Sequence, residues 1–359
     1  MTYDVLVIGG GIAGVSAAAH LAPHGSVLLA ERETQLGFHA TGRSAAMFLA
    51  DYGNDIVCAL NAASAPGHHA AGVLSQRDML MLARAEDEDQ LVREQAELGL
   101  DRIDLRDAKP MFPILNDAVV AHVAHRADAF DLDTDALLQH YRRAASEAGA
   151  AVETGAEITF ITRRGPDWQV LCADGRAFIA KQIVNAAGAW VDEIAAMAGV
   201  GPIGFTPYRR SMAQLPSPGG LDTSGWAFVD EVYERWYAKP QSGKLIVSPQ
   251  EEDLVTPHDA FADGMVLAEG LARFEALVET PVTRVEHSWA GLRTFAPDRA
   301  LVLGRDPAEP SFVWCAGQGG YGFQTAPAAA ALIGDIVAGT PPALDAHVTD
   351  ALSPARFAQ

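Results

Sequence analysis

A glycine-rich turn between a buried strand and a helix constrains this chain more than any other feature. Residues 5–8, Val-Leu-Val-Ile, form a short apolar run of the kind found in strands covered on both faces. Six residues that include four glycines follow, and the alanine-rich segment 15–21 then predicts a helix. Residues 27–30, Val-Leu-Leu-Ala, predict the next strand. Strand, helix and strand in this order form a βαβ unit, so we expect the chain to begin with a parallel sheet.

The glycines of this turn have the G-x-G-x-x-G spacing of a dinucleotide-binding loop. Gly9 allows the tight turn, Gly11 allows a pyrophosphate to approach the backbone, and Gly14 allows the helix to pack on the strand. The positive N-terminal end of the helix then favours the diphosphate. Glu31 follows the second strand, where its carboxylate can accept hydrogen bonds from ribose hydroxyls and disfavours a 2′-phosphate. The motif alone leaves FAD and NAD open.

Later segments predict further elements around this unit. Helices are expected at 87–98, 134–148 (with Asp133 or Asp135 near its N-terminus), 262–278 and 325–337. Residues 156–186 read as strands with a tight turn at Asp174-Gly175, and 205–250 predict a second, antiparallel sheet. The final strands are expected near 301–303 and 312–314. This order indicates a dinucleotide-binding domain interrupted by insertions.

Composition narrows the classes of partner. The net charge of -20 disfavours binding to phosphate backbones and anionic lipid, so nucleic acid is not expected as a ligand. Cys58, Cys172 and Cys315 have no metal-ligand spacing, which predicts no zinc site, no disulfide framework and no bound metal. No signal-peptide pattern and no apolar run of about 18–20 residues is found, which favours a cytoplasmic protein without a membrane span.

Three spaced blocks resemble the FAD-dependent D-amino-acid oxidase/glycine oxidase (DAO) superfamily. The first follows Glu31 and includes Gly37-Phe38-His39-Ala40-Thr41-Gly42-Arg43-Ser44-Ala45-Ala46, the second is Val184 to Trp190, and the third is Gly317 to Thr325. They occur at the start, middle and end of the chain in the order found in that superfamily. The late glycines can bring backbone N–H groups and a helix N-terminus to the flavin, where these dipoles stabilise the charge that develops on its reduction.

The resemblance implies a glutathione-reductase-type FAD fold, in which a Rossmann-like α/β FAD-binding domain is interrupted by an antiparallel-sheet substrate domain. We expect residues 1–75, 130–200 and 288–359 in the FAD-binding domain, and 76–129 and 201–287 in the substrate domain. The positions expected to bind FAD are Gly9, Gly11, Ile12, Ala13, Gly14, Glu31, Arg32, Thr41, Gly42, Arg43, Ser44, Ala45, Ala187, Gly188, Trp190, Arg293, Gly319, Gly320, Tyr321, Gly322 and Gln324.

Within the superfamily the chain is most similar to bacterial FAD-dependent D-arginine dehydrogenases. The similarity includes Thr41 to Ala46, Asp131 to Leu137, Tyr208 to Ser211 and Trp289 to Phe295. It implies that Arg210 and Arg293 hold the substrate carboxylate, that Tyr52 and Tyr237 close over the substrate, and that Gln324 lies beside substrate and flavin. An arginine fork suits a carboxylate, and a fixed carboxylate aims the substrate Cα–H at the flavin.

Several residues depart from that pattern. Asp78 stands, after a one-residue gap, for the glutamate that selects cationic side chains, and it is one methylene shorter. Asp230 and Phe228 replace pocket residues of another character, and Met47 replaces a histidine close to the substrate. Relatives that tether flavin use a cysteine in the block corresponding to 293–296, where this chain has none. The FAD is therefore expected to be non-covalent.

The sequence thus predicts oxidative deamination of a D-amino acid, with basic D-amino acids favoured by Asp78 and Asp230. Hydride would pass from Cα to the flavin, and the imino acid would hydrolyse to a 2-oxo acid and ammonia. The alternatives are a secondary-amine oxidase or dehydrogenase acting on glycine, sarcosine or proline derivatives, a non-catalytic flavin-binding subunit, and an NAD-linked dehydrogenase. The partners expected are an amino-acid substrate and an electron acceptor whose identity (oxygen, quinone or redox protein) the sequence leaves open.

Overall fold

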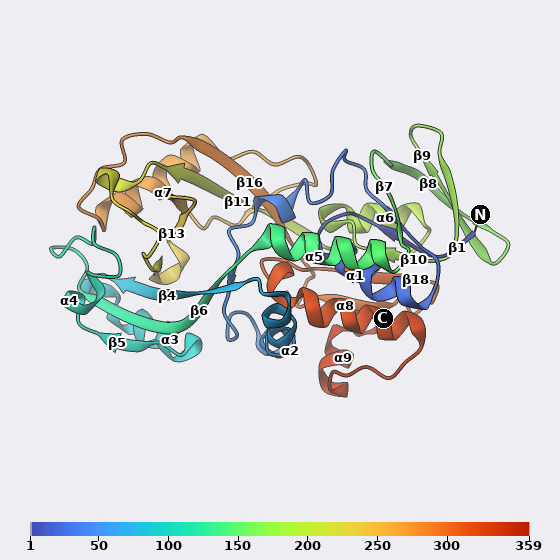
Figure 1. The fold of residues 1–359 in the computed structure, drawn as a ribbon, viewed down its shortest axis with the longest axis horizontal. Coiled ribbons are helices and arrows are strands. Elements are labelled where there is room, and N and C mark those ends of the chain that lie inside the picture. The colour runs from blue at the N-terminus through green and yellow to red at the C-terminus, as the bar shows by residue number, and fades with distance from the viewer. Residues whose placement is uncertain (1, 359) are drawn as a thin grey trace.

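The computed structural model describes residues 2–358 and contains two large sheets that form two lobes (Figure 1). The first sheet has eight strands among these residues. Its main path, in spatial order, is β17 (Val302–Arg305), β18 (Phe312–Ala316), β10 (Ala177–Asn185), β1 (Thr2–Ile8), β2 (Val27–Ala30) and β7 (Ala151–Glu153). The strands β8 (Ile158–Arg164) and β9 (Asp167–Cys172) extend it from β10.

The centre of this sheet is parallel, as the first residues of the chain predict. β1 pairs in parallel with β2 and with β10, and β10 pairs in parallel with β18. Alternate β1 side chains enter different cores: Val5 and Val7 pack on one face, and Leu6 and Ile8 on the other. The continuous apolar run therefore predicted its two-sided burial correctly.

Helices cover both faces of the first sheet. One face carries α1 (Ile12–Leu21), α5 (Thr134–Glu147) and α8 (Gly322–Ala338), and α2 (Asp55–Ala71) and α9 (Ala346–Leu352) lie near α8 (Figure 1). The other face carries α6 (Val191–Met197). Asp133 caps α5 by accepting a hydrogen bond from the backbone N–H of Ala136, as expected at a helix start.

The second sheet has ten strands within the described part of the chain and is mostly antiparallel. Its main path is β15 (Asp253–Leu254), β11 (Thr206–Leu215), β14 (Lys244–Ser248), β13 (Tyr237–Gln241), β12 (Phe228–Glu231), β4 (Leu74–Ala83), β6 (His122–Leu132) and β3 (Met47–Phe48). β16 (His287–Phe295) pairs with β11, and β5 (Asp101–Ile103) pairs with β6. The pair β4–β12 is parallel, which joins the two inserted segments of the chain.

Three helices pack around this second sheet: α3 (Glu88–Leu98), α4 (Leu105–Ala108) and α7 (Gly264–Ala276). β16 pairs with β11 over its whole length, so residues 288–295, which were expected in the FAD-binding domain, pair with the second sheet. The fold class is confirmed as mixed α/β with a parallel and an antiparallel sheet, and the exact division into domains stays a proposal.

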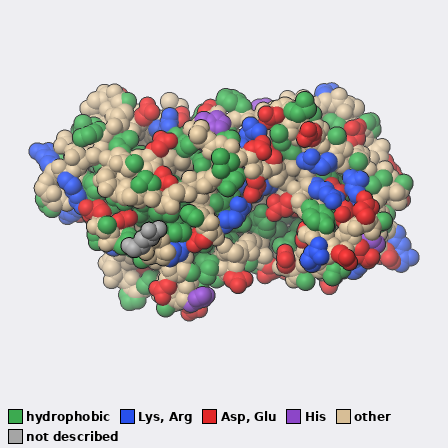
Figure 2. All heavy atoms as spheres, turned by 180° about the vertical axis from the view of Figure 1, so that it is seen from behind, with side chains coloured by type: hydrophobic (Ala, Val, Ile, Leu, Met, Phe, Trp, Pro, Cys, Tyr) green, Lys and Arg blue, Asp and Glu red, His purple; other side chains and the backbone are tan. Residues whose placement is uncertain are grey.

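Surface charges are extensively paired. On the face drawn in Figure 2, acidic and basic side chains neighbour one another in several places, between areas of apolar and uncharged surface. No helix among residues 2–358 combines the length and hydropathy that crossing a membrane requires. The same residues hold no group of three or more His, Cys, Asp and Glu side chains arranged for a metal ion.

Candidate active site

Two adjoining cavities run from the glycine-rich turn towards the second sheet. The distal cavity measures about 460 Å³ and is lined by residues near Glu31, Arg32, His39 and Trp190. The proximal cavity measures about 230 Å³ and is lined by residues of both lobes. Both share Gly11, Ala40, Thr41, Arg43, Ala186, Gly188 and Leu292 in their linings. The shared wall makes them two parts of one elongated site.

The glycine turn is built by close backbone contacts. A Cβ on Gly14 would lie 1.9 Å from the carbonyl oxygen of Gly9, so only glycine lets α1 approach the end of β1. Glu31 accepts hydrogen bonds from the backbone N–H of Gly10 at 2.5 Å and of Glu33 at 2.8 Å. These bonds fix the carboxylate at the distal cavity, on the side of the turn where a ribose is expected.

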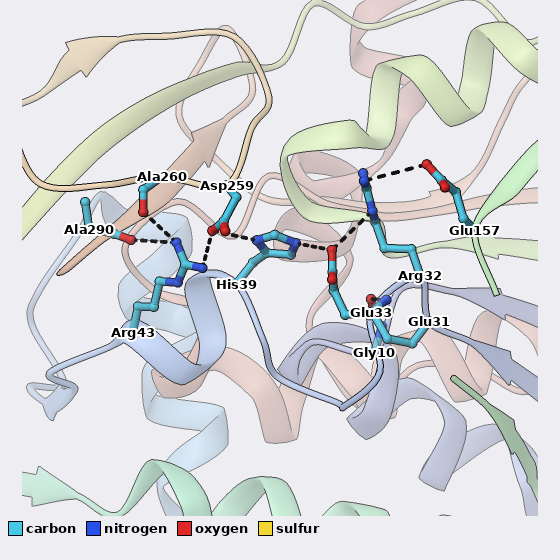
Figure 3. Close-up of polar contacts among 10 residues, drawn as sticks. All are labelled: Gly10, Glu31, Arg32, Glu33, His39, Arg43, Glu157, Asp259, Ala260 and Ala290. Carbon is cyan, nitrogen blue, oxygen red and sulfur yellow. Dashed lines mark hydrogen bonds and ion pairs between the residues drawn. The ribbon is translucent and has the colours of Figure 1, made fainter. Parts of the chain in front are cut away.

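Arg32 and Trp190 form a flat wall of the distal cavity. The Arg32 guanidinium lies 5.0 Å from the centroid of the Trp190 ring, and both residues line the cavity. Arg32 also forms ion pairs with Glu33 at 3.3 Å and Glu157 at 3.6 Å (Figure 3). This wall is suited to stacking against a planar heterocycle.

The glycine cluster before α8 lies along the proximal cavity. Gly319 lies so close to Phe295 that a Cβ would come within 2.1 Å of the ring, and a Cβ on Gly320 would lie 3.1 Å from Cζ of Arg293. No side chain caps the first turn of α8 among the described residues, so its N–H groups and positive dipole end are available to a ligand. Bare backbone and the dipole of a helix N-terminus therefore meet at this wall, where the resemblance leads us to expect the flavin ring.

Two arginines enter the proximal cavity from neighbouring strands. Arg210 on β11 and Arg293 on β16 lie next to one another in the register of these strands, since Tyr208 pairs with Arg293 and Arg210 with Gly291. Arg210 is 3% exposed and donates hydrogen bonds to the backbone oxygen of Glu251 at 3.0 Å and to Gln250 at 3.3 Å. Its Nη2 is buried without a hydrogen-bond partner in the described chain.

The electrostatics of this pair favour an anion. Burial, together with the charge of Arg293, lowers the pKa of the Arg210 guanidinium from its ordinary value. Glu234 and Glu252 lie 3.7 and 3.6 Å from Arg210 Nη2, beyond hydrogen-bond length. A ligand carboxylate could supply the hydrogen bonds that Nη2 lacks.

Tyrosines and Gln324 complete the proximal cavity. Tyr237 is buried and its hydroxyl lies 3.1 Å from the sulfur of Met212, while burial raises the pKa of its phenol. Tyr52 packs against Tyr321 with ring centroids 5.4 Å apart. Gln324 is 4% exposed and its Oε1 accepts a hydrogen bond from the Leu49 N–H at 2.7 Å. This bond ties the segment that carries Tyr52 to the start of α8.

Most of the expected site residues come together in these two cavities. The expected residues that line one or both are Gly9, Gly11, Ile12, Ala13, Glu31, Arg32, Thr41, Arg43, Ser44, Ala45, Tyr52, Ala187, Gly188, Trp190, Arg210, Tyr237, Arg293, Gly319, Gly320, Gly322 and Gln324. Gly14, Gly42 and Tyr321 lie behind the lining, where they support it through packing.

Asp78 is the expected residue that the structure does not bring to the site. A β-bulge between Arg77 and Met79 interrupts the pairing of β4 with β6. Met79 lines the cavity, whereas the Asp78 carboxylate lies 2.8 Å from Nε2 of His125. Asp230, in contrast, does lie at the site. Its carboxylate lines the proximal cavity and accepts a hydrogen bond from Gln250 at 2.6 Å.

Three other lining residues were not predicted from the sequence. Glu234 and Gln250 are polar members of the proximal cavity, and His258 lines the distal one. Glu234 and Gln250 both have positive φ angles, of 49° and 57°. No sequence pattern marks such turns in residues other than glycine, asparagine and aspartate.

The family follows from a match over most of the chain. Residues 4–336 match the family model described as DAO, FAD dependent oxidoreductase. The chain belongs to this family. It is therefore an FAD-dependent oxidoreductase, and the cofactor expected from the sequence is confirmed at the level of the family.

Individual relatives are distant. The HcnC subunit of hydrogen cyanide synthase from Pseudomonas aeruginosa is 26% identical over 211 residues, which are 57% of this chain and 47% of that protein. The chain thus aligns with about half the length of this relative. Glycine oxidase from Geobacillus kaustophilus superposes with a TM-score of 0.82 at 21% identity, covering 98% of both chains. L-Proline dehydrogenase from P. horikoshii superposes with a TM-score of 0.81 at 22% identity, covering 99% of this chain and 98% of that one. These likenesses show the fold.

Proposed function

We propose that the protein oxidises the C–N bond of an amino acid, with D-amino acids as the substrates. The observation that carries this proposal is the pair Arg210 and Arg293 in one cavity beside the glycine-rich start of α8. Two guanidinium groups with an unsatisfied buried N–H are suited to a carboxylate. A non-catalytic flavin-binding subunit would have no use for such a pair, and an NAD-linked enzyme would have none for the late glycine cluster.

The residues of the site would act mainly by positioning. FAD, when bound, would supply the acceptor for the hydride of the substrate Cα–H bond. Arg210 and Arg293 would hold the carboxylate and so fix the direction of the Cα–H bond, while Tyr52 and Tyr237 would cover the substrate and exclude water. A neutral substrate amine supplies the electron pair that forms the C=N bond, so no strong protein base is needed. The released imino acid and one water then give a 2-oxo acid and ammonia.

The side chain of the substrate would extend between apolar residues towards Asp230. Met79, Met212 and Phe228 line this part of the cavity, and an aliphatic chain would pack against them. Burial, with a smaller effect of Glu234, raises the pKa of the Asp230 carboxyl well above its ordinary value. A cationic side chain of the substrate would offset the free-energy cost of ionising this buried carboxyl. We therefore assign the preference for basic D-amino acids to Asp230 and drop Asp78 from the site.

A second candidate is a secondary-amine oxidase or dehydrogenase. It is favoured by the fold shared with glycine oxidase and L-proline dehydrogenase over almost the entire chain. The same arginines would hold the carboxylate of glycine, sarcosine or a proline derivative. In that case the substrate would leave the Asp230 end of the cavity empty.

Anaerobic mixing of the purified holoenzyme with single amino acids distinguishes these functions. The flavin absorbance near ~450 nm bleaches when hydride is transferred. Bleaching by D-amino acids and not by their L forms supports the first candidate, and bleaching only by N-alkyl glycines or prolines supports the second. Full retention of colour with every amine tested would contradict both.

A further inference from the structure

A short strap from the second sheet lies beside Arg43, at the junction of the two cavities. We define the strap as residues 255–260, which connect β15 with the segment that leads to α7. Its Ala260 is 4% exposed and packs with Ala290 and Leu292 of β16 and with Ala189 from the other lobe. His258 and Ala260 both line the distal cavity. The strap is therefore part of the wall of the cofactor site.

A single carboxylate joins this strap to the loop of the FAD-binding lobe. Asp259 forms an ion pair with Nη2 of Arg43, and Nδ1 of His39 lies 3.9 Å from the same carboxylate (Figure 3). Arg43 Nη1 donates to the backbone oxygens of Ala260 at 2.8 Å and Ala290 at 3.0 Å. The guanidinium thus holds the strap and β16 together.

The contacts continue along the distal cavity. His39 Nε2 lies 2.9 Å from Glu33, and Glu33 lies 3.3 Å from Nε of Arg32 (Figure 3). The His39 ring packs against Trp190 with centroids 4.8 Å apart. A row of polar contacts therefore runs from Asp259 in the strap through His39 and Glu33 to Arg32, in the wall expected to stack on the adenine.

We propose that Asp259, Arg43 and His39 form a latch that retains FAD by closing the strap over the middle of the cofactor. FAD is long enough to need both cavities, and Arg43 lines both of them at their junction. An FAD that fills both cavities would pass Arg43 and the strap residues His258 and Ala260, and on this proposal its release requires the strap to move. The Arg43 guanidinium already binds Asp259 and two backbone carbonyl oxygens, so Arg43 acts on the cofactor through the strap. Asp259 and His39 are positioning residues and touch no reacting atom.

The test is the rate at which FAD leaves the holoenzyme. Free flavin fluorescence is followed after dilution of wild type and Asp259→Asn to nanomolar concentration at 25 °C. Loss of one partly exposed ion pair should make release about fivefold faster. The thermal midpoint of the apoprotein should change little, because the Asp259 side chain is 45% exposed.

Asp174→Asn is the matched control. Asp174 is also 45% exposed and pairs with an arginine, Arg176, in the turn between β9 and β10, and neither residue lines either cavity. Its substitution removes the same charge and should leave FAD release unchanged. An equal acceleration in both variants would mean that net charge, and not the latch, governs retention, which overturns the proposal.

A double variant separates the latch from direct phosphate binding. In the Arg43→Gln background, Asp259→Asn should add little further acceleration, because the partner of Asp259 has already been removed. If Arg43 instead binds the pyrophosphate directly, Asp259→Asn would free its charge and slow FAD release. Slower or unchanged release in the single Asp259→Asn variant therefore refutes the latch, while the family assignment and the proposed substrate would stand.

Discussion

Replacing Glu234 by glutamine tests the role of Arg210 as a carboxylate anchor. Oε2 of Glu234 lies 3.7 Å from Nη2 of Arg210, the buried nitrogen without a hydrogen-bond partner among the described residues. Two successive residues with positive φ, Tyr233 at 65° and Glu234 at 49°, hold the carboxylate there. Glu234 would compete with a substrate carboxylate that binds beside Arg210, as would Glu252, which lies 3.6 Å from the same nitrogen and keeps its charge in this variant.

The expected effect follows from Coulomb's law. Two unit charges at this separation attract by about 1 kcal/mol in water. Water screens this interaction strongly, because the Glu234 side chain is 55% exposed. Glu234→Gln should therefore strengthen the binding of a simple anion about fivefold. The gain should shrink at high ionic strength, since salt screens exposed charges.

Acetate is a suitable probe because it carries a carboxylate and no amine. Its dissociation constant is measured from the change in flavin absorbance when the holoenzyme is titrated. Glu279→Gln is the control, since Glu279 is also 55% exposed but pairs with Lys109 on the surface. The Glu279→Gln control should bind acetate with the dissociation constant of the wild type. If it does, and Glu234→Gln binds acetate no more tightly than the wild type, the anion does not bind beside Arg210.

Further predictions concern the buried groups around the site. Burial raises the pKa of the Asp230 carboxyl above its ordinary value of 3.8. For this group alone, the folded protein is therefore most stable below pH 3.8, where the carboxyl is protonated in both states, and it loses stability as the pH rises towards the higher pKa of the folded state. Asp230→Asn should thus raise the melting temperature more at pH 8 than at pH 4. Burial also raises the pKa of Cys315 to about 12, so a thiol reagent should modify the half-buried Cys58 first and Cys315 only on unfolding, as peptide mapping would show. All three cysteines lie outside the cavity linings, so acid precipitation should leave a colourless pellet and a yellow supernatant, and a yellow pellet would disprove non-covalent binding. Gly14→Ala should weaken FAD binding at least about tenfold in fluorescence titrations, since its Cβ would clash with Gly9.

The sequence predicted best those elements whose signal is local. The strand, glycine turn and helix at the start of the chain each carry their own periodicity, and the structure has β1, α1 and β2 there. The turn at Asp174-Gly175 likewise joins β9 to β10 as expected. In contrast, α2 was not predicted. It contains Pro66 and buries small and polar residues such as Asn61 and Ser64, because it packs closely on α8.

The site shows where local reasoning ends. The sequence favoured Asp78 as the partner for a cationic group, because it stands for the glutamate of the resembling family, and Asp230 was noted only as a departure from an apolar pocket residue. The β-bulge beside Asp78 sets which side chain of β4 enters the cavity, and a one-residue shift reverses the faces of a strand. The strap contact of Asp259 with Arg43 joins residues 216 positions apart in the sequence. Contacts of this kind arise only from the assembled fold.

The order of strands in the first sheet also affects how the protein is made. β1 lies between β2 and β10, and β10 in turn needs β18, which begins at Phe312. At the usual speed of a ribosome, roughly 15 to 60 seconds separate the synthesis of β1 from that of β18. During that time the apolar edge of a half-built sheet is exposed to other chains. We therefore expect newly made protein to depend on chaperones, and its yield to depend on synthesis temperature, more strongly than the stability of the finished enzyme would suggest.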